Sequence, residues 1–152
     1  MFMQNVASFS LAKKIKDKNK DVTTIIGGAN CESPMGQVII RYVEAIDYVF
    51  SGPGLKSFPE FVEHQLAHEV WKCGSIKGVF TKKNYMFHSG PEAIGEELSI
   101  DVPIDLDYQP FVNTLSENFP EGQFDPILLF ETSRGCWWGV KNHCTFCGLN
   151  RA

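Results

Sequence analysis

The fold of this chain is decided by the stretch Asp21-Val22-Thr23-Thr24-Ile25-Ile26-Gly27-Gly28-Ala29-Asn30. After Asp21 the residues are β-branched or apolar until they reach a pair of glycines, which is typical of a buried strand that leads into a tight turn. The pattern returns in residues 46–50, which lead into Ser51-Gly52-Pro53-Gly54. We therefore expect two short strands, each followed at its carboxyl end by a glycine-rich turn.

Helical patterns separate these strands. Apolar residues recur at helical spacing over residues 3–16, 35–42 and about 58–70. Helices that alternate with strands at this short spacing indicate βαβ units and a parallel sheet, whose ligands bind beyond the carboxyl ends of the strands. Residues 76–80 are a candidate for one more short strand. The sequence thus predicts an α/β fold with a parallel sheet.

The pattern is less regular in the second half of the chain. Residues 88–125 carry several prolines, glycines and acidic residues, which indicates an irregular linker with a short helix near residues 111–118. Residues 126–131 are mostly apolar and predict a further strand, which leads into a loop with three cysteines.

Composition narrows the class of protein. With 43% hydrophobic residues, the 152-residue chain can bury a core. A formal net charge of −4 argues against a general nucleic-acid surface. The sequence shows no apolar run long enough for a membrane span and no secretory signal, so we expect a cytoplasmic protein with no membrane partner.

The three cysteines have a spacing that suits a metal. Cys136, Cys144 and Cys147 follow the pattern C-x7-C-x2-C, and thiolates at such spacing indicate a metal or cluster in a reducing compartment. A cubane iron–sulfur cluster held by three cysteines leaves one iron open to a substrate. Zinc is the alternative, because His143 would complete a Cys3His set.

Two other pairs of residues are predicted to be structural. Cys31 and Cys73 are expected to be small buried hydrophobic residues. His64 and His68 lie one turn apart in an expected helix, a spacing that permits metal binding. Because no set of carboxylates accompanies them, we expect ordinary surface or half-buried histidines.

Longer strings surround these motifs. The tail contains Arg134-Gly135-Cys136-Trp137-Trp138-Gly139 and Cys144-Thr145-Phe146-Cys147-Gly148-Leu149-Asn150, and upstream the chain contains Gly27-Gly28-Ala29-Asn30-Cys31-Glu32 and Asp47-Tyr48-Val49-Phe50-Ser51-Gly52. The tail resembles the cluster loop of radical S-adenosylmethionine enzymes, although that superfamily usually shows C-x3-C-x2-C. With its longer gap it is similar to one subgroup, the cobalamin-domain radical enzymes of ribosomal peptide maturation. The upstream strings resemble the second half of that subgroup's cobalamin-binding domain.

The resemblance implies a domain organisation. Residues 1–80 would be the carboxyl-terminal half of a cobalamin (B12)-binding domain, with a partial Rossmann-like parallel sheet. Residues 81–125 would be a linker. Residues 126–152 would be the first strand and cysteine loop of a truncated radical S-adenosylmethionine (β/α) barrel.

The resemblance also implies cofactors and site residues. A 4Fe-4S cluster would be held by three thiolates, S-adenosylmethionine would lie beside an aromatic residue and a glycine, and cobalamin would lie in a crevice lined by three glycines. The three thiolates would be those of Cys136, Cys144 and Cys147. Phe146 and Gly148 would lie beside S-adenosylmethionine. The crevice for cobalamin would be lined by Gly27, Gly28 and Gly52. The implied reaction cleaves S-adenosylmethionine reductively to a 5′-deoxyadenosyl radical, and methylcobalamin would pass a methyl group to a carbon of the peptide substrate.

Two departures from the subgroup bear on cobalamin. The chain has Gly52-Pro53-Gly54 where the subgroup usually shows Gly-Glu-Gly. It also has no Asp-x-His-x-x-Gly stretch, so a lower-face histidine ligand to cobalt of that type is not expected.

Chain length bears on activity. Five residues follow Cys147, whereas a (β/α)8 barrel takes about 250 residues. We therefore expect a fragment that is inactive alone or is completed, as a split enzyme, by a second polypeptide that supplies the barrel. No residue is assigned a catalytic role. The alternatives are a cobalamin or iron–sulfur binding module and a zinc-binding interaction module.

Overall fold

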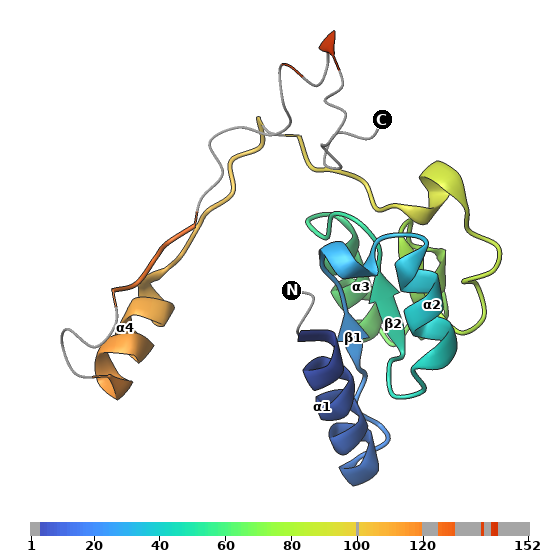
Figure 1. Cartoon of the computed structure of the whole chain (residues 1–152), viewed down its shortest axis with the longest axis horizontal. Coiled ribbons are helices and arrows are strands. Elements are labelled where there is room, and N and C mark those ends of the chain that lie inside the picture. The colour runs from blue at the N-terminus through green and yellow to red at the C-terminus, as the bar shows by residue number, and fades with distance from the viewer. Residues whose placement is uncertain (1–3, 100, 120–124, 130–137, 139–140, 143–152) are drawn as a thin grey trace. The chain divides into compact units, whose positions relative to one another are not determined.

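The structure is a computed structural model that describes residues 4–99, 101–119, 125–129, 138 and 141–142. The chain divides into two compact units, Met1–Leu98 and Ser99–Ala152. The first unit contains a small sheet with helices around it, and the second contains one helix among the described residues (Figure 1). The protein is therefore mixed α/β. Among the residues described, no helix has both the length and the apolar character that a membrane span requires.

The first unit begins with the expected alternation of helices and strands. Its α-helices and strands are α1 (Gln4–Lys18), β1 (Ile25–Ile26), α2 (Met35–Tyr42), β2 (Tyr48–Phe50), α3 (Ser57–Leu66) and β3 (Val79–Phe80). Three short 3₁₀ helices lie between or after them: η1 (Ala29–Cys31), η2 (Val70–Ser75) and η3 (Gly90–Ala93). The second expected helix has the predicted bounds, and the third ends four residues early because His68 has a φ of 58° and turns the chain.

The sheet is mixed, which corrects the prediction of a parallel sheet. β1 and β2 pair in parallel, with Ile25 opposite Tyr48, whereas β2 and β3 are antiparallel, with Val49 opposite Phe80. The reason is a turn just before β3. The Val79 N–H donates to the Ile76 carbonyl (3.1 Å), and Gly78 between them has a φ of 76°. This turn reverses the chain, so β3 runs back along β2.

The strand β1 is shorter than predicted, because side chains replace part of its ladder. The Thr24 N–H donates to the Asp47 carboxylate (2.8 Å), and the Asp47 and Tyr48 N–H groups both donate to the Thr24 carbonyl (3.0 and 3.2 Å). The two strands are therefore joined at their amino ends by one aspartate as well as by backbone bonds.

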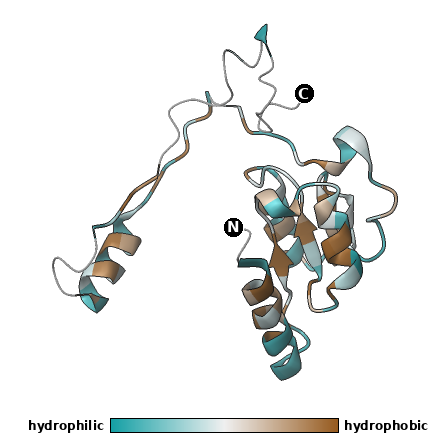
Figure 2. Cartoon of the chain, viewed as in Figure 1, coloured by the Kyte–Doolittle hydropathy of each residue, from teal (hydrophilic) through white to brown (hydrophobic). Residues whose placement is uncertain are grey.

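Alternate residues of the strands build a core on each face of the sheet. Val49 and Phe80 pack with buried residues of α1 and α2, while Phe50 and Val79 pack with Phe61 of α3 and with η2. The brown, hydrophobic parts of α1, α2 and α3 gather around the strands in Figure 2. Cys31 and Cys73 are free thiols in these two cores, as predicted.

The start of the expected linker belongs to the first unit. Residues 81–98 lie within it, and Ala93 is completely buried in the core with Val49 and Phe80. The second unit contains α4 (Gln109–Asn118), which confirms the short helix predicted in this region.

The strand expected at residues 126–131 is not formed in the part that is described. Residues 125–129 have neither helix nor strand, and Ile127 is 81% exposed. A strand needs a partner for its backbone groups, and no described segment pairs with this one. The last two residues of the expected strand lie outside the described part of the chain.

Candidate functional site

The candidate site is the edge of the sheet where β1 and β2 end. Because these two strands are parallel, their glycine-rich turns lie at the same edge. Gly27 fits closely here, since a Cβ on it would lie 3.4 Å from the Phe50 Cβ. Gly28 has a φ of 100°, and apart from its chain neighbours no described residue has an atom within 4 Å of the position that a Cβ would take. A ligand can therefore approach the backbone at Gly28 closely.

A small hollow opens beside this turn. It has a volume of about 90 Å³ and lies between the start of α1 and the end of β1. Its lining residues are Gln4, Asn5, Ser8, Ile26, Gly27, Gly28, Ala29 and Asn30. All of them are uncharged, so the hollow suits a polar, uncharged group better than an ion.

Asn30 is a residue of this hollow to which the sequence assigned no role. It is 9% exposed, and its Nδ2 group has no hydrogen-bond partner among the described residues. A buried donor without a partner destabilises a fold by about 1–3 kcal/mol, so such groups are uncommon unless a ligand or water accepts from them. The signal in the sequence is an amide residue two positions after the Gly27-Gly28 pair.

The turn after β2 is covered, in contrast to the turn after β1. Residues 93–96 pack over this turn, and we call them the cover segment. A Cβ on Gly52 would lie 2.6 Å from Ile94 Cγ2, and Gly52 has a φ of 85°. The Gly95 N–H donates to the Ser51 carbonyl (2.7 Å). Gly52 as a cobalamin contact stays a prediction, and it requires the cover segment to move.

Close backbone packing and ion pairs hold the cover segment. A Cβ on Gly78 would lie 2.3 Å from the Gly95 nitrogen, so these two backbones touch. Lys56 and Lys77 form ion pairs with Glu96 (3.2 and 3.6 Å). The hydrogen bond from Lys56, followed by the charges of both lysines, lowers the pKa of the Glu96 carboxyl. The pairs are exposed, so the backbone packing is the stronger restraint.

The opposite ends of the strands carry a charged cluster. Lys16 Nζ lies 2.6 Å from Asp47 Oδ2, and Thr24 donates to the same oxygen. Burial alone would raise the pKa of Asp47, but the hydrogen bonds from Lys16 and Thr24 outweigh it, so the pKa is lowered. Asp47 therefore stays ionised and ties α1 to both strands.

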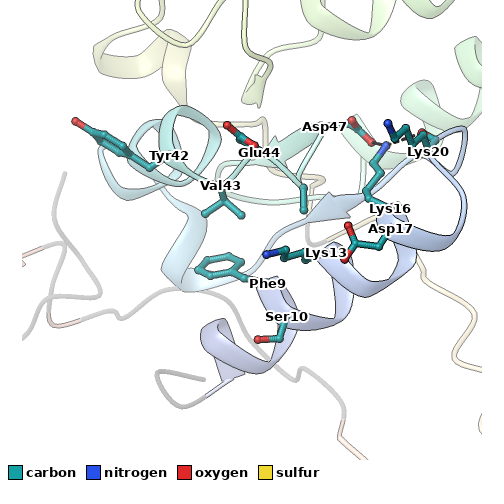
Figure 3. Close-up of a pocket in the computed structure, with 11 residues that line it drawn as sticks. Phe9, Ser10, Lys13, Lys16, Asp17, Lys20, Tyr42, Val43, Glu44 and Asp47 are labelled. Atoms are coloured by element: carbon teal, nitrogen blue, oxygen red, sulfur yellow. Dashed lines mark hydrogen bonds and ion pairs between the residues drawn. The ribbon is translucent and has the colours of Figure 1, made fainter.

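A groove of about 720 Å³ lies beside this cluster, between α1 and residues 42–47 (Figure 3). Three lysines and three acidic residues line it, together with Phe9 and Val43. The charged residues are Lys13, Lys16, Lys20, Asp17, Glu44 and Asp47. Positive and negative charges are balanced, and the groove lies away from the carboxyl ends of β1 and β2. It is therefore a weak candidate for the ligand site of an α/β sheet.

The predicted metal site belongs to the part of the chain that the structure does not describe. Its ligands and neighbours lie outside the described residues: Cys136, Cys144, Cys147, Phe146, Gly148 and the alternative zinc ligand His143. The cluster therefore stays a prediction. In the described ranges, no group of three or more His, Cys, Asp or Glu residues could hold a metal ion.

The two histidines at helical spacing do not share a helix face. His68 lies beyond the end of α3, and its positive φ takes the chain out of the helix. His64 lies near two glutamates instead, with its Nδ1 3.4 Å from Glu69 Oε2 and its Nε2 3.8 Å from Glu60 Oε1. His64 is half-buried and His68 is exposed, as expected for structural residues.

Comparisons with protein-family models, with curated proteins and with solved structures found no match to this chain. The site is therefore interpreted from its own geometry and from the resemblance of its motifs.

Proposed function

We propose that this chain carries the cluster loop and part of the cobalamin-binding unit of a cobalamin-dependent radical S-adenosylmethionine enzyme. The reaction would be the C-methylation of a ribosomally made peptide. The main support from the structure is the parallel pair β1 and β2, whose glycine-rich turns lie at one edge of the sheet. The cysteine motif of the tail is the support from the sequence.

The residues at this edge fit part of a cobalamin. The open backbone at Gly28 permits close approach, and Asn30 Nδ2, which has no partner among the described residues, could donate to an amide oxygen of the cofactor. The hollow of about 90 Å³ is smaller than the 300–1,000 Å³ of ordinary ligand pockets, so it would hold only one edge group of the cofactor. Gly52 does not fit a cobalamin contact in this arrangement, because Ile94 covers it.

The cofactors would supply the chemistry, and the chain would supply their positions. When bound, the cluster would supply an electron and the cobalamin a methyl group. Asn30 and the Gly28 turn would orient one edge of the corrinoid. The three thiolates of Cys136, Cys144 and Cys147 would each hold one iron of the cluster, and the fourth iron would be open to S-adenosylmethionine.

Reconstitution with iron and sulfide under anaerobic conditions tests the cluster. A brown protein whose broad absorption bleaches with dithionite is expected, and Cys144→Ala should lower its iron content. Cys73→Ala is the matched control, because Cys73 is buried in a core of the first unit and is not part of the motif. A colourless protein that retains zinc would contradict the cluster and favour the zinc-binding interaction module, in which His143 is the fourth ligand.

Titration with hydroxocobalamin tests the corrinoid site. The full chain should shift the absorption spectrum of the cofactor, and Asn30→Ala should weaken binding about fivefold to tenfold through the loss of one hydrogen bond. Gly54→Ala is a suitable control, because a Cβ on Gly54 meets no atom within 4 Å. Equal binding by all three proteins would remove Asn30 from the site. Cobalamin binding without a cluster would favour a cobalamin-binding module.

A further inference from the structure

A second groove lies on the first unit, at the amino ends of β1 and β2 and so at the opposite edge of the sheet from Gly28. It has a volume of about 780 Å³. Four segments line it: the end of α1, the start of β2, the 3₁₀ helix η2 and the turn after β3. The lining residues used below are Lys16, Lys20, Tyr48, Trp71, Lys82 and Lys83. We call it the basic groove.

The walls of the basic groove are joined by hydrogen bonds. The Asn84 side chain accepts from the Thr81 N–H (2.6 Å) and donates to the carbonyls of Gly74 (2.7 Å) and Val79 (2.9 Å). The turn that carries Lys83 is therefore fixed to the helix η2 that carries Trp71. A ligand would meet a preformed surface, which lowers the entropic cost of binding.

The basic groove has a positive charge that the fold does not use. Four lysines and two aspartates line it. Lys16 is paired with Asp47 (2.6 Å), and Lys82 donates to the carbonyls of Ile40 and Val43 at the end of α2. The ammonium groups of Lys20 and Lys83 have no partner among the described residues. In the described part of the groove, two ammonium groups and one carboxylate, that of Asp21, thus have no partner, which leaves an excess of positive charge for a ligand.

An exposed aromatic residue lies in the same groove. Trp71 is 73% exposed, and its indole makes no ring contact or hydrogen bond with a described residue. Tyr48 in the same groove is held against Phe61, with ring centroids 4.8 Å apart. Exposed tryptophans beside basic residues are common at binding surfaces, because the indole offers a large apolar face and an N–H donor.

We propose that the basic groove binds an acidic peptide segment. Its carboxylates would pair with Lys20 and Lys83, and an apolar side chain between them would pack on Trp71. Two free ammonium groups match a short segment with a few carboxylates. A nucleic acid is disfavoured, because a chain of net charge −4 repels a backbone with one charge every few ångströms. The inference does not depend on the proposed function, since the groove lies away from the carboxyl-end turns.

The probe is the acetylated peptide Glu-Glu-Phe-Glu-Glu, titrated into the full chain. In a Trp137→Phe/Trp138→Phe background Trp71 is the only tryptophan, so its fluorescence reports binding directly. We expect saturable binding that weakens at high salt. The Lys20→Glu/Lys83→Glu variant should bind at least about tenfold more weakly, because attraction becomes repulsion at two positions.

The matched control is Lys14→Glu/Lys18→Glu. Lys14 and Lys18 lie on α1, which ends two residues before Lys20, and neither lines either groove. Their substitution changes the net charge by the same amount as Lys20→Glu/Lys83→Glu. Circular dichroism should show that both variants keep their helices. Equal weakening by the two variants would overturn the proposal, because binding would then follow net charge alone. Equal binding of Lys-Lys-Phe-Lys-Lys, tighter binding of an oligothymidylate, or no saturable binding would also overturn it.

Discussion

Gly28 and Gly52 occupy equivalent positions after two parallel strands, yet they have different surroundings. Both have a positive φ, of 100° and 85°. A Cβ on Gly28 would meet no atom of the described residues within 4 Å, its chain neighbours aside, whereas a Cβ on Gly52 would meet Ile94 at 2.6 Å. The same residue type thus keeps a surface open at one turn and lets the cover segment pack at the other. A glycine in a turn is therefore not by itself evidence of a ligand site.

The largest expected effect comes from alanine at these two positions. Gly52→Ala should destabilise the fold by about 3 kcal/mol, because strain at positive φ adds to the overlap with Ile94. Gly28→Ala should lower the free energy of unfolding by only about 1–2 kcal/mol, through strain alone. Urea denaturation measures both values. Equal losses would break the comparison and show that the cover segment does not rest on Gly52.

A double variant sharpens the same comparison. If the overlap with Ile94 causes the extra loss, Gly52→Ala/Ile94→Ala should be about 1 kcal/mol more stable than the sum of the two single changes predicts. The pair Gly28→Ala/Ile94→Ala is the control. Its two losses of stability should add, because a Cβ on Gly28 would meet no atom of Ile94 or of any other described residue beyond its chain neighbours within 4 Å. An additive result for both pairs would contradict the contact.

A change at the amino ends of the strands should affect both turns alike. Asp47→Asn removes the ion pair with Lys16 and should cost about 1 kcal/mol at neutral pH, a modest value because both side chains are partly exposed. The folded pKa of Asp47 is lowered, so its contribution is present above the unfolded value of about 3.9 and is lost as pH falls through the folded value.

Denaturation of the wild type and of Asp47→Asn at several pH values checks this effect. The difference in free energy of unfolding should be full above about pH 5 and should shrink in acid. Amide hydrogen exchange at Gly28 and Gly52 should rise to a similar degree in the variant. A rise at one turn only would mean that Asp47 supports a single strand.

The smallest expected effect on stability comes from removing the ion pairs of the cover segment. Glu96→Gln removes the pairs with Lys56 and Lys77, which are exposed and screened by salt. We expect a fall in the unfolding midpoint smaller than that of Asp47→Asn, and no difference from the wild type at high salt. Because the pKa of Glu96 is lowered, its small contribution is lost as pH falls. A large fall would show that ion pairs rather than backbone packing hold the segment.

The order of the helices and of the first two strands was predictable from local patterns. α2 has the predicted bounds, and α4 begins two residues before the predicted start. β1 proved shorter because Thr24 bonds to Asp47, a residue 23 positions away. The candidate site was likewise predictable only in part. The Gly27-Gly28 turn was identified from its sequence. Asn30 was recognised only through its burial and its amide, which has no hydrogen-bond partner among the described residues.

The sequence by itself determined the α/β class, because the spacing of apolar residues and the glycine-rich turns are local properties. It also determined the cysteine motif, whose interpretation as a cluster loop remains a proposal. Only the tertiary structure decided the direction of β3, the packing of residues 81–98 into the first unit with Ala93 buried, and the covering of Gly52 by Ile94. These features depend on contacts between segments far apart in the chain, such as Ser51 with Gly95, and no local pattern specifies such contacts.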